Sequence, residues 1–397
     1  MTRMASPYGV HGGSTYTPRT MSTAEAVPAG VDDAVNSQIL KVSEDRIQGF
    51  HRYPFRTIAE DSGVDLDTVL ERLRAMVEAG TIRRIRQTLM ATSLAPGALV
   101  AWKVPQDDIK ATFDYMFEQD PFSGHVVTRT TDRETPGSQY KLWTTLKVPK
   151  PYDMDAHCRY LMTKTGAQGY RLLPAKKLFA LGVGHVRRRT IEPGEKTDEP
   201  GRVLDTKIVD LTDREWRILM ALKREFAPAE IVEDPWVARA AEAGETIEDF
   251  CEVAASLNER RVIGRFSTFL EHVKKHSDGT QVTRYNALFH WRVPEGEQLR
   301  AGQEVGRHHC MTHAYWREGG PEFADVNIMG VSHGTDKERV LEHKAAIDAH
   351  LESVGIPVSY TNVFWGGRSE IKPSEISPIA YREWCAREGL DPADMTA

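Results

Sequence analysis

Apolar positions at helical spacing, followed by a short alternating segment, begin the ordered part of the chain. After Gly63 and Asp65, which predict a turn and a helix N-cap, apolar side chains recur every three or four residues: Val69, Leu70, Leu73, Met76 and Val77. Gly80 ends this helix, and Thr81–Arg86 predicts a strand. A helix, a tight turn, a second helix and a strand are typical of a winged helix-turn-helix, which we place over residues 33–90.

Residues 91–186 have a different pattern, in which short strands alternate with helices. Strands are expected at 98–104, 126–131, 139–148 and 170–181, and amphipathic helices at 107–118 and 153–164. The resulting order, βαββαβ, is that of a ferredoxin-like domain, in which helices cover one face of an antiparallel sheet. The predicted fold class is therefore α+β.

The same plan begins again after a polar stretch, residues 187–207, which predicts a linker. A second winged helix is expected over 208–272 and a second ferredoxin-like domain over 273–368. Three sets of residues match in order between the halves: Ile82, Arg84 and Ile85 with Ile263, Arg265 and Phe266; Trp102–Pro105 with Trp291–Pro294; and Arg133 with Arg317. We infer a tandem repeat. Residues 1–32 are expected to be a disordered tail, and residues 369–397 are a C-terminal extension with no internal counterpart.

Composition narrows the class of protein without defining a function. The chain has 397 residues, a formal charge of −6 and four scattered cysteines, none in a CxxC pair. This argues against a zinc ribbon, an iron–sulfur cluster or a disulfide framework. No apolar run approaches the roughly 20 residues that a membrane helix needs, and the N-terminus lacks a signal-peptide core. A cytoplasmic protein with no membrane partner is expected.

DNA is not expected to be the partner, although the winged-helix pattern keeps a DNA-binding regulator as an alternative. The helix that would enter a major groove has Asp65, Asp67 and Glu71 in its first turns, and its counterpart in the second half has Glu248 and Asp249. Acidic side chains at these positions repel the phosphate backbone, which dominates DNA affinity.

The strongest candidate for chemistry is the segment Met311–Arg317. Side chains alternate along a strand, so His313, Tyr315 and Arg317 are expected on one face and the residues between them on the other. An imidazole, a phenol and a guanidinium on one surface can bind an anionic substrate and move a proton. The alternative is a histidine that only makes a structural hydrogen bond.

A metal site is not expected at His308, His309 and Cys310. Adjacent side chains of a strand point to opposite faces, so the three would not converge on one ion. One of them as an axial ligand of iron is a weaker alternative.

Several motifs, taken in order, resemble the siroheme decarboxylases, which are relatives of the Lrp/AsnC regulators. The resemblance spans residues 38–368 and includes Trp102–Pro105. Tyr140–Leu146 is similar to the family's Tyr-Asn-Leu-Trp segment, and Met311–Arg317 resembles its Val-Ser-His-Cys-Tyr-x-Arg segment. Further matches are Gly49-Phe50 with Pro54-Phe55, and Ile82-Arg83-Arg84. Family members usually consist of two related subunits, and this chain resembles both joined.

The resemblance implies a carboxy-lyase that removes carbon dioxide from the C12 and C18 acetates of siroheme, giving didecarboxysiroheme on the way to haem or haem d1. His313 would then be the general acid, with Tyr315 and Arg317 beside it. A polycarboxylate needs several guanidiniums, and the expected substrate-binding residues are Arg84, Arg86, Arg129, Arg133, Arg265 and Asn327. No cofactor beyond the iron tetrapyrrole is implied. Haem is a possible ligand, and a homodimer is possible.

The two halves differ at the candidate site. Matching Arg133 with Arg317 places Arg129 at the position of His313 and Thr131 at that of Tyr315. One competent site, in the second half, is therefore expected. The alternatives are a DNA-binding regulator of the Lrp/AsnC type and a non-catalytic haem-binding protein.

Overall fold

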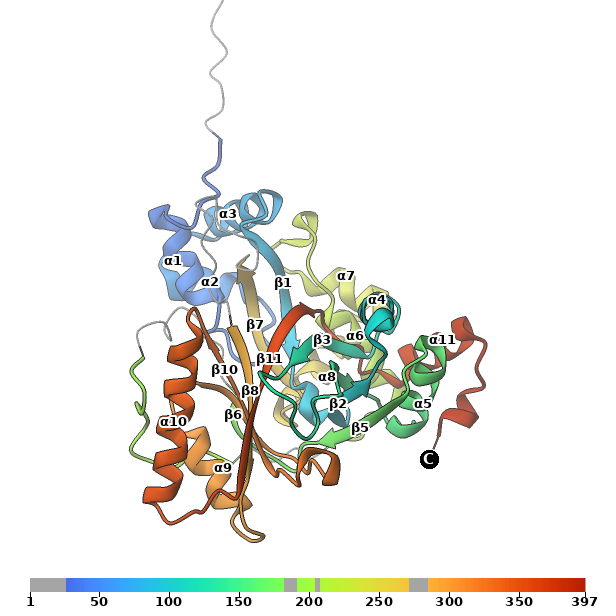
Figure 1. The fold of residues 1–397 in the computed structure, drawn as a ribbon. Helices are drawn as coiled ribbons and strands as arrows, with labels where there is room; N and C mark the ends of the chain where they lie inside the picture. The colour runs from blue at the N-terminus through green and yellow to red at the C-terminus, as the bar shows by residue number, and fades with distance from the viewer. Residues whose placement is uncertain (1–25, 182–190, 204–207, 271–284, 397) are drawn as a thin grey trace, which may run out of the picture.

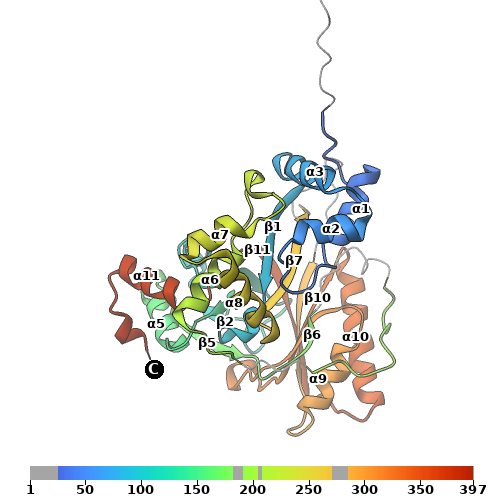
Figure 2. The same ribbon diagram turned by 180° about the vertical axis from the view of Figure 1, so that it is seen from behind.

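The computed structural model of the protein describes residues 26–181, 191–203, 208–270 and 285–396. This part of the chain contains a two-stranded sheet with its helices and a nine-stranded sheet, and the helices of residues 34–78 lie at the top of the view in Figure 1. Further helices cover the outside of the nine-stranded sheet. Seen from behind, α6, α7 and α8 lie on the same side of the molecule as the C-terminal helix α11 (Figure 2).

Each half begins with a unit of three helices and a strand. The first contains α1 (Ala34–Ser43), α2 (Pro54–Ser62), α3 (Leu66–Glu78) and β1 (Ile82–Leu89). The second contains α6 (Asp213–Lys223), α7 (Trp236–Ala243), α8 (Ile247–Glu259) and β7 (Ile263–Leu270). Gly63 ends α2 with φ 71°, and the Asp65 carboxylate accepts the Thr68 backbone N–H at 2.9 Å to begin α3.

The final strands of the two units pair with each other. In the antiparallel sheet of β1 and β7, Arg84 lies opposite Phe269 and Gln87 opposite Phe266. One apolar core fills both units, and Phe55, Phe226 and Trp236 pack around Phe266 in it. The two units therefore form one layer.

Each half then continues with strands and helices in the order βαββαβ. In the first half these are β2 (Gly97–Lys103), α4 (Ile109–Glu118), β3 (Ser123–Thr130), β4 (Leu142–Lys147), α5 (Met154–Thr165) and β5 (Gly169–Pro174). In the second they are β8 (Tyr285–Arg292), α9 (Gln298–Gly306), β9 (Met311–Trp316), β10 (Ile328–Gly334), α10 (Lys337–Ser353) and β11 (Tyr360–Ile371). Short 3-10 helices occur at Ala91–Ser93, Gln106–Asp108, Pro228–Glu230, Pro321–Phe323 and Pro392–Met395.

The strand expected at 170–181 is two strands, β5 and β6 (Lys177–Leu181), which lie at opposite ends of the sheet. The strand order is β5-β2-β4-β3-β11-β8-β10-β9-β6. Because only Ala175 and Lys176 separate β5 from β6, the two ends of this row lie next to each other, and the sheet closes on itself. In the second half, β11 likewise pairs with β8 through Tyr360–Trp365 and with β3 through Trp365–Ile371. Each half thus completes the sheet of the other.

The closed sheet has an inner face shared by the two halves. Its apolar cluster includes Val127 and Trp143 from the first half and Leu288, Met329 and Phe364 from the second. The outer face of each half packs against that half's own helices, in two separate clusters. Because side chains alternate along a strand, every second residue of β3, β4, β9 and β10 faces this shared interior.

The C-terminal extension is part of the first half. Its predicted boundary at residue 369 falls inside β11, and α11 (Pro378–Glu388) adds Tyr381 and Trp384 to the outer core of that half. The Tyr381 ring stacks on Tyr152 at 4.0 Å, and its hydroxyl lies 3.0 Å from Nδ1 of His157. Residues 191–203 of the predicted linker run along α9, where Gly201 N–H donates to Gln303 O. The other predicted domain boundaries remain predictions.

None of the helices in the described ranges is both long enough and apolar enough to cross a bilayer.

Candidate active site

His313, Tyr315 and Arg317 share one face of β9 and its C-terminal end, as predicted. Tyr315 lies opposite Met329 of the inner cluster, so the three side chains face the interior of the closed sheet. The His313 and Tyr315 rings are nearly parallel, with centroids 6.0 Å apart, and the Arg317 guanidinium carbon lies 4.3 Å from the Tyr315 ring centroid. An acid–base group, a phenol and a cation are therefore in one row.

Burial affects the ionisation of Tyr315 and Arg317. Burial raises the pKa of Tyr315, so the phenol keeps its proton at neutral pH. Arg317 is 8 % exposed, and its Nη1 donates to the backbone oxygen of Leu173 on β5. Burial also lowers the pKa of Arg317, because the charge has left water without meeting a carboxylate among the described residues.

Strand register shows which residues of the first half are equivalent to this row. The two WxVP segments supply a fixed starting point. In the first half, Trp102 pairs with Leu142, which pairs with Thr128. In the second half, Trp291 pairs with Ile328, which pairs with Trp316, so Thr128 is equivalent to Trp316. His125 comes three residues before Thr128, as His313 comes three before Trp316. Arg129 and Arg317 each follow one residue after, so His125 is equivalent to His313 and Arg129 to Arg317.

Hydrogen bonds agree with this register. Arg317 donates to the oxygen of Leu173, and Arg129 donates to the oxygen of Phe364, 3.2 Å away, on the equivalent strand of the other half. The predicted equivalence of Arg129 with His313, and of Arg133 with Arg317, is therefore wrong by four residues. Both halves carry a His-x-x-x-Arg motif, His125–Arg129 and His313–Arg317, which was the sequence signal that we missed.

The first half therefore keeps the imidazole and the guanidinium, and lacks the phenol. Val127 lies where Tyr315 lies in the second half. Burial, together with the positive charges of Arg129 and His313, lowers the pKa of His125 to about 4. Because His313 contributes to this shift, groups of both halves share the interior.

The interior is strongly electropositive. Burial and Arg129 lower the pKa of His290 to about 3, and burial and Arg317 lower the pKa of Lys147 to about 8. Among the described residues, no carboxylate contributes to the pKa of Arg129, Arg317 or Lys147. Unpaired buried cations favour an anionic ligand, which would offset their lost hydration.

Three of the other predicted substrate-binding residues meet on the two-stranded sheet. Arg84, Arg86 and Arg265 lie around the Phe269 ring, with guanidinium carbons 5.4, 5.6 and 5.9 Å from its centroid. Arg84 also pairs with Glu225 at 3.2 Å. This second cationic group exists because β1 pairs with β7, and it unites residues of both halves.

Arg133 and Asn327 do not join either group. Arg133 is exposed. The Asn327 side chain bonds the backbone of Val293 twice, accepting its N–H at 3.0 Å and donating to its oxygen at 2.8 Å. Both functional groups of this amide thus hold the turn after β8, and we do not include Asn327 in the proposed site.

His308, His309 and Cys310 lie in a turn after α9 and not on a strand, so the predicted reason for excluding a metal there does not apply. His308 is buried with its ring 5.1 Å from that of His350. In the described part of the chain, no group of three or more His, Cys, Asp or Glu residues has the arrangement of a metal site.

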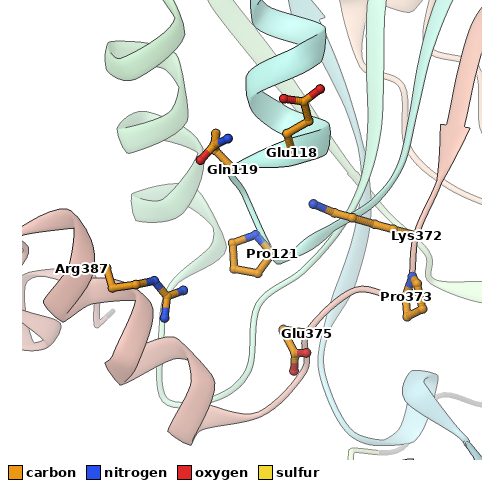
Figure 3. A pocket seen from close by; sticks show the side chains of 7 residues that line it. All are labelled: Glu118, Gln119, Pro121, Lys372, Pro373, Glu375 and Arg387. Carbon is orange, nitrogen blue, oxygen red and sulfur yellow. The ribbon is translucent and has the colours of Figure 1, made fainter. Parts of the chain in front are cut away.

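A cavity of about 380 Å³ lies elsewhere, between the end of α4, the segment after β11 and α11 (Figure 3). Its charged groups are largely satisfied by the protein: Lys372 Nζ donates to the backbone oxygen of Asp120 at 2.6 Å, and Glu375 pairs with Lys223 at 2.8 Å. It is separate from the His313 row.

Each half of the chain contains a segment that resembles an AsnC-like ligand-binding domain. A family model described as "AsnC-like ligand binding domain" matches residues 94–180 and 283–360, one match in each half. These matches cover the strands that carry both His-x-x-x-Arg motifs.

Two relatives that match this chain are named as siroheme decarboxylases. A siroheme decarboxylase of Hydrogenobacter thermophilus is 26% identical over 308 residues, covering 76% of this chain and 84% of the relative. A siroheme decarboxylase beta subunit of Methanosarcina barkeri is 27% identical over 149 residues, covering 37% and 95%. The crystal structure of the siroheme decarboxylase NirDL shares the fold, with a TM-score of 0.64 and 21% identity over 89% of this chain and 99% of that one. NirDL has also been crystallised with an iron-uroporphyrin III analogue, and that structure matches equally well, with a TM-score of 0.64. The chain is thus similar to siroheme decarboxylases over about three quarters of its length.

Proposed function

We propose that the protein is a carboxy-lyase that removes carbon dioxide from the C12 and C18 acetate side chains of siroheme, giving didecarboxysiroheme. The observation that carries this proposal is the row of His313, Tyr315 and Arg317, which faces an interior with several buried cations. Siroheme is a polycarboxylate, and its negative charges would offset the desolvation of these cations. The names of the relatives, and the iron-uroporphyrin III analogue bound by NirDL, support a tetrapyrrole as the ligand.

The reaction requires one proton for each carbon dioxide released. When the bond between the methylene and the carboxylate breaks, its electron pair passes into the macrocycle and must be protonated at the methylene carbon to give a methyl group. His313 in its protonated form supplies this proton and recovers it from solvent. Tyr315, stacked on His313 and bonded to Arg317, holds the imidazole in position, and Arg317 binds the carboxylate that leaves. The macrocycle accepts the electron pair, so no further cofactor is needed.

The first half takes part with a weaker version of the same row. At neutral pH, His125 is uncharged, because its pKa is about 4 in the ligand-free protein. A bound carboxylate raises the pKa of a neighbouring imidazole, since it stabilises the charged form. His125 thus becomes a proton donor only when substrate is bound, and it does so without the phenol that supports His313.

The layer formed by the two helical units serves ligand binding rather than DNA binding in this proposal. We assign its two units as winged helix-turn-helix units. The basic residues of α3 are used within the protein: Arg72 pairs with Asp33 at 3.2 Å, and Arg74 donates to the oxygen of Ile231 at 2.6 Å. Arg84, Arg86 and Arg265, on the sheet that joins the two units, are left to bind carboxylates of the tetrapyrrole. A cytoplasmic location and a homodimer remain predictions.

The test is an anaerobic incubation of the purified protein with siroheme, followed by mass spectrometry of the tetrapyrrole. We expect products that have lost one and two molecules of carbon dioxide. His313→Ala should abolish the second loss or both, whereas His309→Ala, at an exposed histidine outside the sheet, should behave like the parent. Siroheme recovered unchanged from the parent protein would refute the proposal.

A further inference from the structure

Lys147 is a cation on the inner face of the sheet, and the proposed reaction gives it no role. It is the last residue of β4 and lies four residues after Trp143 of the inner cluster. Because side chains on a strand return to the same face every two residues, the Lys147 side chain also faces the interior. Gly97 lies directly opposite on β2, and a Cβ added to Gly97 would lie 3.5 Å from both Cγ and Nζ of Lys147. The lysine side chain therefore lies across the space that Gly97 leaves.

Lys147 gives the two halves different surroundings for their arginines. In the second half, the residues equivalent to Gly97 and Lys147 are Asn286 and His333. The Asn286 amide oxygen lies 3.4 Å from Nη2 of Arg129, so that guanidinium has a neutral acceptor beside it. The equivalent guanidinium, Arg317, has no such side-chain amide oxygen among the described residues, and its positive charge contributes to the lowered pKa of Lys147.

Two partly desolvated cations that face each other repel, and the repulsion is strongest where water is excluded. Within the described ranges, Lys147 forms no ion pair, and the partners of Arg317 are a backbone oxygen and Tyr315, neither of which carries a negative charge. An anion between the two groups would remove the repulsion and satisfy the free donors of both.

We propose that Lys147 and Arg317 together bind one carboxylate of the tetrapyrrole, so that the first half supplies part of the binding site for the second-half row. This inference rests on the proposed function for the identity of the ligand. In this arrangement Lys147 positions the carboxylate next to Tyr315 and His313 and takes no proton from the substrate.

The charge of Lys147 makes this clamp sensitive to pH between pH 7 and pH 9. The titratable groups on the inner faces of the other strands are His313, Tyr315 and Arg317 on β9, His125 and Arg129 on β3, and His290 on β8. His125 is neutral above pH 6, Tyr315 is a protonated phenol, and Arg317 remains a cation, because arginine does not lose its proton in proteins. The ammonium of Lys147, with a pKa of about 8, is the group whose charge changes between pH 7 and pH 9.

The test is a spectroscopic titration with iron-uroporphyrin III, which reports binding without turnover, at several pH values. We expect Lys147→Gln to weaken binding about tenfold or more at pH 7, since a charge-assisted contact to a carboxylate is lost. Lys147→Arg should bind like the parent, because the positive charge remains. Lys103→Gln, at an exposed lysine at the other end of β2, is the matched control and should leave binding unchanged.

The pH profile separates a binding role from a structural one. Parent affinity should fall about tenfold between pH 7 and pH 9 as Lys147 loses its proton, whereas Lys147→Arg and Lys147→Gln should both be nearly flat in this range. Binding by Lys147→Gln within twofold of the parent, or a parental pH slope in Lys147→Arg, would overturn the inference. A parent that binds iron-uroporphyrin III with the expected lysine effects and yet leaves siroheme intact would refute the proposed function alone.

Discussion

Arg129→Met should make the ligand-free protein more stable and its ligand affinity lower. Arg129 is 4 % exposed, burial lowers its pKa, and its Nε has no hydrogen-bond partner in the described part of the chain. Removing an unpaired guanidinium from water costs several kcal/mol. Its hydrogen bonds, to Phe364 O at 3.2 Å and to the Asn286 amide oxygen at 3.4 Å, return only about 1.5–3 kcal/mol.

Methionine fills a similar space without a charge. We therefore expect Arg129→Met to raise the free energy of unfolding by about 1–3 kcal/mol, as measured by the urea midpoint at an unchanged slope. The matched control is Arg133→Met at an exposed arginine, which should change stability by no more than about 0.5 kcal/mol.

Ligand should reverse the order of stability. At 100 times its Kd, iron-uroporphyrin III adds about 2.7 kcal/mol to the parent, and Arg129→Met should lose most of this gain. If Arg129→Met is instead destabilised by about 1 kcal/mol or more while Arg133→Met is neutral, the guanidinium is a structural group with a satisfied environment. The cations of the interior would then not need an anionic ligand to offset their desolvation, and the proposed anion site would be refuted.

Three further predictions concern the interior and the C-terminal extension. The pKa of His290 is about 3 in the folded protein against about 6.5 unfolded, so the unfolded state binds more protons below pH 6.5. His290 alone should lower stability by about 2 kcal/mol between pH 7 and pH 5, and in urea titrations the fall should be smaller by that amount in His290→Phe than in the parent. Tyr381→Phe removes a buried hydroxyl 3.0 Å from His157 and should cost about 1–2 kcal/mol of unfolding free energy with siroheme turnover unchanged; a neutral result would mean that the contact is not a hydrogen bond. Tyr315→Phe should lower kcat for siroheme about tenfold or more with little change in KM, and an unchanged kcat would remove Tyr315 from the proposed row.

The sequence predicted local structure well where a local cause exists. The N-cap at Asp65, the turn at Gly63 and the shared face of His313, Tyr315 and Arg317 all depend on residues a few positions apart, and the structure confirms them. Alternation along a strand specifies a face, and this is why the second-half row could be found without a structure.

Alternation does not specify register, and the error in the first half follows from this. Arg129, Thr131 and Arg133 have the same spacing as His313, Tyr315 and Arg317, and a shift of four residues keeps every side chain on its face. Only the pairing of β3 with β4, which depends on contacts between distant segments, shows that His125 is the equivalent of His313. The closure of the sheet was missed for the same reason, because the pairing of β11 with β3 joins segments about 240 residues apart.

The presence of both halves in one chain allows the interior to be asymmetric. In a symmetric dimer of identical subunits, each substitution appears in both copies of a site, so Val127 in place of Tyr315 would remove the phenol from both rows. In this chain the halves vary independently, although each completes the sheet of the other through β11 and β6. The first half can therefore exchange a phenol for a valine, and bring Lys147 to Arg317, while the second half keeps an intact row. The closed sheet makes this exchange useful, because its shared interior lets a change in one half act on a ligand bound by the other.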